Sequence, residues 1–368
     1  MTREEDWVQR AHLFCKEKIA PHAAAYDAQE ELPQTLFHEM GQEGFLGLTI
    51  PPEYGGSAAS TLAIGHVLAE FSSASLAVAT GLAVHLSVAS APIVRWGNGA
   101  QKEHYLPRMA KGEWLGAFAL TEPSTGSDSQ HITTRYAVDG DGYRIDGSKT
   151  FITNGGLAQV VLVFATHNPS VGSRGISCFL VDKGTPGFSD SRHLSKLGLR
   201  GSQTNELLLD GCHVTKEAML GREGDGFKVA MTALEGGRVG ISACSLGVAR
   251  AALGCMREVV RDESAEWMKV ALARSYVDVE AAQALMERAA NLKDSGRDYG
   301  MAASAAKLFA SQAAFRVASR AVDLTGMEGT KRGATAERLF RDSRVLTIVE
   351  GTTEIQEMIL GRSLARRA

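Results

Sequence analysis

The most informative stretch of the chain is Arg341-Asp-Ser-Arg-Val-Leu-Thr-Ile-Val-Glu350-Gly-Thr-Thr-Glu-Ile-Gln356. Glu350 follows two apolar residues and precedes a glycine. A carboxylate in apolar surroundings has a raised pKa, so it can act as a general base near neutral pH. Gly351 has no Cβ and therefore lets the backbone approach a substrate. Thr352 or Thr353 could also cap a following helix, which is compatible with a catalytic Glu350.

The rest of the chain divides into three regions that differ in hydrophobic pattern. Residues 223–368 contain no proline and carry apolar residues at helical spacing, which indicates long helices packed as a bundle. Residues 114–222 contain short apolar runs between Gly and Asp clusters, which indicates an antiparallel sandwich or small barrel. Residues 1–113 are again helical. We therefore predict a multidomain α+β fold with domains at 1–113, 114–222 and 223–368.

Local breaks are also predicted inside these regions. Pro21 is expected to interrupt the first helix, because proline lacks the backbone N–H that a helix interior uses. The pair Asp146-Gly147 is expected to separate two short strands, 143–145 and 150–153.

Composition narrows the possible functions. The 368 residues include 44% hydrophobic and 22% charged residues, which is ordinary for a globular protein and argues against disorder. A formal charge of −3 gives no basic excess for nucleic acid. Five cysteines without a C-x-x-C pair, and histidines without ligand spacing, predict a reducing compartment and no metal site.

Two observations bear on membranes and targeting. Five of the first ten residues are charged, unlike a signal peptide, so we expect a cytoplasmic protein. The apolar run 74–94 approaches the length of a membrane span. It contains His85 and several serines, however, so we prefer a helix buried in protein and expect no membrane association.

Three further segments are candidates for chemistry. The hydroxyl-rich turn Leu120–Asp128 could face a planar ligand with its N–H groups, or be a plain surface turn. In Asp146–Gly155, Phe151 could lie against a flat ring, or be one core aromatic of a hairpin. The adjacent Gly236 and Gly237 would weaken a helix by about 2 kcal/mol in total, which indicates close approach of a ligand or another helix.

In this order along the chain, these segments closely resemble the acyl-CoA dehydrogenase family of flavoproteins. The resemblance implies an N-terminal helical domain, a central β-domain and a C-terminal four-helix bundle. It also implies bound FAD and αβ-dehydrogenation of an acyl thioester, in which a base removes the α-proton and flavin N5 accepts the β-hydrogen as hydride. Further segments that carry the resemblance are Pro51–Gly56, Tyr105–Trp114, Lys196–Ser202 and Gly226–Lys228.

The resemblance also implies a role for individual residues. Glu350 matches the base of most family members. Other members carry the base at the position of Gly237, which cannot be one. The cofactor-binding positions are Leu120, Thr121 and Ser127 at the flavin ring, Phe151 and Thr153 beside it, and Thr352 and Glu354 toward the FAD phosphates or adenosine. The substrate-binding positions are Ser127, Glu235, Arg238 and Gly351.

Two departures from the family pattern bear on the cofactor. No Arg-x-x-Phe-Gly element follows the helix that ends near Leu253. Asp323 stands where an amide normally approaches the cofactor's phosphates, and two nearby anions repel. A non-catalytic or flavin-poor partner subunit, and a flavin oxidase or monooxygenase, therefore stay open as alternatives.

The resemblance further implies the molecules with which the protein works. The substrate is expected to be an acyl-CoA or an acyl carrier protein thioester. An electron-transfer flavoprotein is the expected electron acceptor, and a homotetramer or homodimer the expected assembly.

Overall fold

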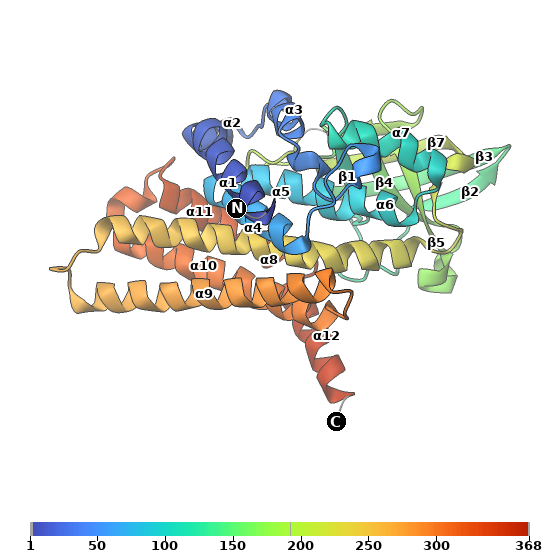
Figure 1. Cartoon of the computed structure of the whole chain (residues 1–368). Coiled ribbons are helices and arrows are strands. Elements are labelled where there is room, and N and C mark those ends of the chain that lie inside the picture. The colour runs from blue at the N-terminus through green and yellow to red at the C-terminus, as the bar shows by residue number, and fades with distance from the viewer. Residues whose placement is uncertain (1–2, 192, 367–368) are drawn as a thin grey trace.

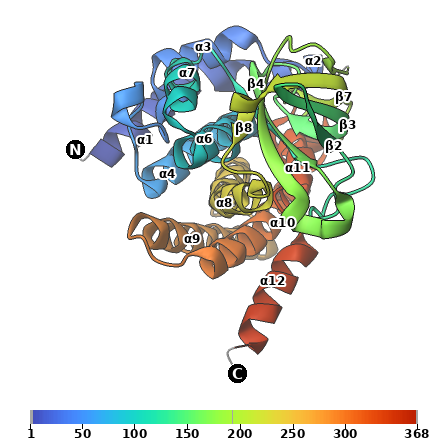
Figure 2. The same cartoon turned by 90° about the vertical axis from the view of Figure 1, so that its right-hand side faces the viewer.

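The computed structural model describes residues 3–191 and 193–366 and confirms the predicted order of helical, sheet and helical domains (Figure 1). The N-terminal helices and the sheet lie along one side of the long helix α8, and α9 and α10 lie along its other side (Figure 2). This arrangement places α8 (Gly226–Val259) at the centre of the molecule.

The N-terminal domain is built from short helices around an apolar core. Pro21 interrupts the first helix, as predicted. The chain passes through a π-helical turn, Cys15–Ile19, and a 3-10 turn, Ala20–His22, which contains the proline, before α-helix resumes at Ala23. The helices are α1 (Arg3–Phe14), α2 (Ala23–Gln29), α3 (Gln34–Gln42), α4 (Thr61–Ala74), α5 (Leu76–Val84), α6 (Ala91–Trp96) and α7 (Gly99–Ala110).

The central domain contains an eight-stranded sheet with both antiparallel and parallel pairs. The prediction of a sheet domain is confirmed, but its pairing is mixed, because β4 pairs in parallel with β1 and with the first residue of β2, Arg135. Parallel neighbours require long connections, which short-range turn signals do not reveal. The strands are β1 (Gly116–Ala119), β2 (Arg135–Asp139), β3 (Gly142–Thr153), β4 (Val160–Thr166), β5 (Ile176–Asp182), β6 (Phe188–Asp190), β7 (Thr204–Thr215) and β8 (Met219–Leu220).

Strand β3 is continuous where the sequence predicted a break, so the prediction of two strands was wrong. The register against β7 shifts between Ile145 and Gly147, and Gly147 has φ +150°. A Cβ at Gly147 would lie 2.6 Å from Thr134 Oγ1. The glycine therefore allows a close approach of β3 to the segment beside it without ending the strand.

The C-terminal domain packs α8, α9, α10 and α11 against one another, while α12 projects away from the body (Figures 1 and 2). Helix α8 runs unbroken through Gly236 and Gly237, as expected of glycines that serve packing rather than a turn. The remaining helices are α9 (Glu266–Asp294), α10 (Gly300–Thr330), α11 (Thr335–Leu346) and α12 (Thr353–Ala365).

Within residues 3–191 and 193–366, two helical stretches are long and apolar enough to cross a membrane by length and composition alone, Leu76–Trp96 and Gly226–Val259. Their most apolar windows are 83% and 78% buried inside the protein. Core helices of globular proteins show the same property, so these stretches are weak evidence for a span.

Candidate active site

Glu350 lies in the short loop between α11 and α12, in an unusual backbone conformation. Its φ is +53°, in the left-handed region, and Gly351 follows with φ +97°. The residue as a whole is partly exposed, but its Oε2 atom is buried and has no hydrogen-bond partner. Burial raises the pKa of this carboxyl to about 7, against the opposing effect of Arg238 and Lys307. A carboxylate in this state can accept a proton near neutral pH.

Gly237 of α8 provides the space that the carboxyl of Glu350 occupies. A Cβ on Gly237 would lie 1.8 Å from Glu350 Oε2 and 2.5 Å from Cδ. The side chain of Glu350 and any side chain at position 237 would therefore occupy the same space, so only one of the two residues can carry a side chain there.

Two buried cations flank Glu350. Arg238 is 9% exposed, and its Nε has no hydrogen-bond partner. Lys307, on α10, is fully buried and donates a hydrogen bond from Nζ to the carbonyl oxygen of Gly351 at 2.7 Å. Both charges favour the ionised form of Glu350, so they partly offset the effect of burial on its pKa.

The sequence analysis missed two residues that hold this loop, Lys307 and Gln356. Gln356 Nε2 donates to the carbonyl oxygens of Gly351 at 3.0 Å and Glu350 at 3.4 Å. Lys307 did carry a signal, because it is a single charge in the alanine-rich run 302–314. Gln356 carried none, since a glutamine in the first turn of a helix is unremarkable.

The sheet domain fixes the turn after β1 by a buried ion pair, which the sequence analysis also missed. Lys149 Nζ lies 2.8 Å from Glu122 Oε1, and their side chains are 0% and 1% exposed. Lys149 also donates to the carbonyl oxygen of Leu120 at 3.2 Å. Burial would raise the pKa of Glu122, but Lys149 and hydrogen bonds donated by Thr133 and Thr134 lower it to about 2. The pair therefore stays charged and holds Leu120 and Thr121 in place.

Phe151 projects from β3 into solvent beside this turn. It has φ +56° at a shift in the β3–β7 register, and it is 66% exposed. The adjacent Thr150 N–H donates to the carbonyl oxygen of Thr121 at 2.9 Å, which joins the strand to the turn. An exposed aromatic ring held by a rigid sheet is a surface on which a flat ring system can stack.

The hydroxyls around Phe151 are available for a ligand. Within the described chain, the side chains of Thr121, Ser127 and Thr153 have no hydrogen-bond partner. Thr121 and Thr153 are partly buried, and Ser127 is exposed. The exposed ring and the free hydroxyls fit a planar, polar-edged cofactor such as a flavin.

The remaining predicted site residues belong to α12, α8 and α10. Thr352 is the N-cap of α12 and accepts a hydrogen bond from the N–H of Ile355 at 3.4 Å, so the capping interpretation is confirmed. Glu354 is exposed in the first turn of α12. Glu235 lies on α8, one turn before the buried Arg238. Asp323 is exposed near the C-terminal end of α10.

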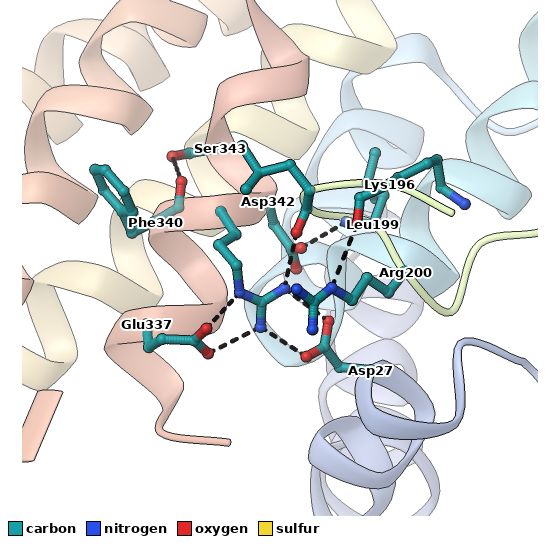
Figure 3. Close-up of polar contacts among 10 residues, drawn as sticks. Asp27, Lys196, Leu199, Arg200, Glu337, Phe340, Asp342 and Ser343 are labelled. Carbon is teal, nitrogen blue, oxygen red and sulfur yellow. Dashed lines mark hydrogen bonds and ion pairs between the residues drawn. The ribbon is translucent and has the colours of Figure 1, made fainter. Parts of the chain in front are cut away.

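A polar junction anchors the helix that leads to Glu350 (Figure 3). Arg341 of α11 donates to both carboxylate oxygens of Asp27 on α2, at 3.0 and 2.6 Å, and to Glu337. The neighbouring Asp342 accepts from the N–H of Leu199 at 2.6 Å. This junction joins all three domains just before the loop that carries Glu350.

A cavity of about 170 Å³ borders α8, and Glu350 is not among the residues that line it. Gly236 lines it, and a Cβ on Gly236 would point to Lys293 Nζ at 3.3 Å. Successive helical residues are turned by about 100°, so Gly236 and Gly237 face different neighbours. Among the described residues, no group of three or more His, Cys, Asp or Glu side chains could hold a metal ion.

The buried carboxyl of raised pKa and the order of helical, sheet and helical domains are the features to compare with known proteins. Family models of the acyl-CoA dehydrogenase N-terminal, middle and C-terminal domains match residues 2–113, 117–212 and 224–365. The chain belongs to the acyl-CoA dehydrogenase family and is an oxidoreductase acting on CH–CH bonds.

Individual relatives are similar over almost the whole chain. An acyl-CoA dehydrogenase of Bacillus subtilis is 41% identical over 95% of both chains. The structure of butyryl-CoA dehydrogenase from Megasphaera elsdenii superposes with a TM-score of 0.96, at 36% identity over 99% of both chains. A structure described as an electron transferring flavoprotein of Acidaminococcus fermentans gives 0.96 at 35% identity, covering 100% of this chain and 99% of that one.

Proposed function

We propose that the protein is an FAD-dependent dehydrogenase that introduces an αβ double bond into an acyl-CoA thioester, with Glu350 as the base. The observation that carries this proposal is the isolated, buried Oε2 of Glu350 in the space left by Gly237. A carboxyl whose pKa is near 7 is matched to removing a weakly acidic α-proton at neutral pH.

The sheet domain is the proposed binding site of the FAD ring system. Phe151 would stack against the ring system, and Leu120, Thr121, Ser127 and Thr153 would meet its edge. Thr352 and Glu354 are the proposed contacts toward its phosphates or adenosine. When bound, FAD supplies the acceptor for the β-hydrogen as hydride.

The loop of Glu350 also offers a group for the thioester carbonyl. Among the described backbone hydrogen bonds outside regular elements, none uses the N–H of Glu350 or of Gly351 as donor. An N–H aimed at the carbonyl would stabilise negative charge that develops there as the α-proton leaves. Arg238 and Glu235 are the proposed neighbours of the thioester from α8, and Gly351 and Ser127 complete the proposed substrate contacts.

The relatives suggest the finer assignments. The butyryl-CoA dehydrogenase favours a short acyl chain, and the electron transferring flavoprotein structure supports such a flavoprotein as electron acceptor. We further propose a homotetramer or homodimer in the cytoplasm. A carrier-protein thioester is the alternative form of the substrate.

Anaerobic titration of the FAD-loaded protein tests the function. Short acyl-CoA thioesters should bleach the visible flavin absorbance, and a parallel series of acyl carrier protein thioesters tests the alternative. Glu350→Gln should keep flavin binding but reduce flavin about 10² to 10⁴-fold more slowly, as expected for loss of a general base. Near-normal reduction in this variant would exclude Glu350 as the base, and a protein that cannot be loaded with FAD would indicate a non-catalytic subunit.

A further inference from the structure

Lys307 is a buried cation that forms no ion pair with any carboxylate among the described residues. It lies in the middle of α10, is 0% exposed, and its one hydrogen bond within the described chain goes to the carbonyl oxygen of Gly351 at 2.7 Å. A buried ammonium group is costly unless it is paired. Lys149, which is equally buried, has its counter-charge Glu122 at 2.8 Å. Lys307 therefore differs from an ordinary buried lysine, and its position needs another explanation.

The bond from Lys307 fixes the backbone beside Glu350. The carbonyl oxygen of Gly351 accepts from Lys307 and also from Gln356 Nε2 at 3.0 Å. Both Glu350 and Gly351 have positive φ, which for a non-glycine residue is unfavourable. Two side chains from two helices thus hold a strained turn whose first residue carries the carboxyl.

The charge of Lys307 also acts on Glu350. The charged and titratable groups that influence Glu350 and Lys307 are Arg238 and Cys244 on α8, Lys307 on α10 and Glu354 on α12. Of these, Arg238 and Lys307 favour the ionised carboxyl. The pKa of Lys307 is itself lowered to about 8 by burial, with Glu350 acting in the opposite direction. Glu350 is therefore the acidic group that most strongly favours the charged form of Lys307, and Glu354 does so to a smaller extent.

We propose that Lys307 is a positioning residue for the base: it anchors the carbonyl of Gly351 so that the carboxyl of Glu350 rests against Gly237, and its charge sets the protonation of that carboxyl. This proposal rests on the proposed function only in that Glu350 is the base. A purely structural lysine would stabilise the fold without affecting the protonation of Glu350.

Two neutral variants separate the effect of the hydrogen bond to Gly351 from the effect of the charge of Lys307. Lys307→Met is close in length and removes both, whereas Lys307→Gln keeps an N–H donor but no charge. Lys269→Met is the control, because Lys269 lies at the start of α9 with its side chain 39% exposed. Thermal unfolding establishes that each variant is folded.

The first readout does not depend on activity. Infrared difference spectra across pH follow the carboxylic acid band of Glu350, assigned by its absence in Glu350→Gln. We expect the pKa of Glu350 to rise by about one unit in Lys307→Met and Lys307→Gln, because an opposite charge is lost. The control should match the unaltered protein.

The second readout is the pH profile of flavin reduction by substrate. In Lys307→Met we expect a loss of about 10²-fold that persists at pH values where Glu350 is ionised, because the carboxyl is misplaced. In Lys307→Gln the loss should shrink at high pH, since only the protonation changes. Folded variants in which both the pKa of Glu350 and the pH profile are unchanged would overturn the proposal. If Glu350→Gln itself reduces flavin normally, the proposed function fails, and the infrared result still decides the link between Lys307 and Glu350.

Discussion

Gly237→Ala tests the position of Glu350 with a single methyl group. The new Cβ would lie 1.8 Å from Glu350 Oε2, whereas real Cβ atoms essentially never lie closer than 3.0 Å to another heavy atom. The carboxyl must therefore retreat by at least about 1.2 Å. A misplacement of about 1 Å in a reacting group costs on the order of 10²-fold in rate. We expect substrate to reduce the flavin of this variant ~10²-fold more slowly.

Stability should change in the opposite sense. Alanine in a helix interior is more favourable than glycine by about 1 kcal/mol, and Gly237 has no positive φ. Displacing the loop offsets part of this gain, so the unfolding temperature should be unchanged or higher. A slower but equally stable enzyme distinguishes misplacement of the base from general damage to the fold.

Gly236→Ala is the matched control for both measurements. It makes the same helix substitution one residue earlier, and its Cβ would meet only the flexible end of Lys293, at 3.3 Å. Stopped-flow measurement of flavin reduction and calorimetry compare the two variants. If Gly237→Ala and Gly236→Ala reduce flavin at the same rate, the carboxyl of Glu350 does not occupy the space above Gly237, and the reasoning fails.

Three other substitutions test the surrounding structure. Lys149→Met should lower the free energy of unfolding by about 3–5 kcal/mol in urea titrations, because it leaves Glu122 buried and unpaired. Combining Lys149→Met with Glu122→Gln should recover part of this loss. A double variant whose loss equals the sum of the two single losses would contradict the pairing. Asp342 has a pKa raised to about 6 by burial, so its stabilising contribution is complete below about pH 4 and is lost as pH rises through about 6. Asp342→Asn should therefore gain stability relative to the unaltered protein across that interval, by up to about 3 kcal/mol, and a constant difference in calorimetry would count against it. Asp323→Gln should tighten FAD binding by the apoprotein in fluorescence titrations if the exposed carboxylate repels the cofactor's phosphates, whereas unchanged affinity would remove that argument.

The order of domains was predictable because each domain has its own hydrophobic periodicity. Long helices such as α9 agree with the helical bundle predicted over residues 223–368, because apolar spacing that extends over many turns is a strong signal. The parallel pairing of β1 with β4 was not predictable, since it joins residues more than 40 positions apart and no local turn specifies it. The continuity of β3 through Gly147 was missed for a related reason: the glycine serves a neighbour, Thr134, that only the folded sheet brings close.

The site was predictable only in part. Glu350 was predicted partly because apolar neighbours and a following glycine indicate burial and a raised pKa, and partly because it matches the base of the family that the chain resembles. The glycine pair of α8 was predicted to mark close approach of a ligand or another helix, whereas the structure places the carboxyl of a loop residue, Glu350, against Gly237. Lys307 and Gln356 were missed because their role lies in hydrogen bonds to a loop 44 and 5 residues away from their own positions. The single charge at position 307 in an alanine-rich run is visible in the sequence, but the sequence does not specify the carbonyl to which it bonds.

The left-handed backbone of Phe151 and Glu350 has a consequence for laboratory evolution. Glycine, asparagine and aspartate tolerate this conformation better than other residues, and β-branched residues tolerate it worst. A saturation library screened for heat resistance should therefore enrich these small residues at both positions. A screen for turnover should retain glutamate at 350, so the two screens are expected to select different sequences at that position.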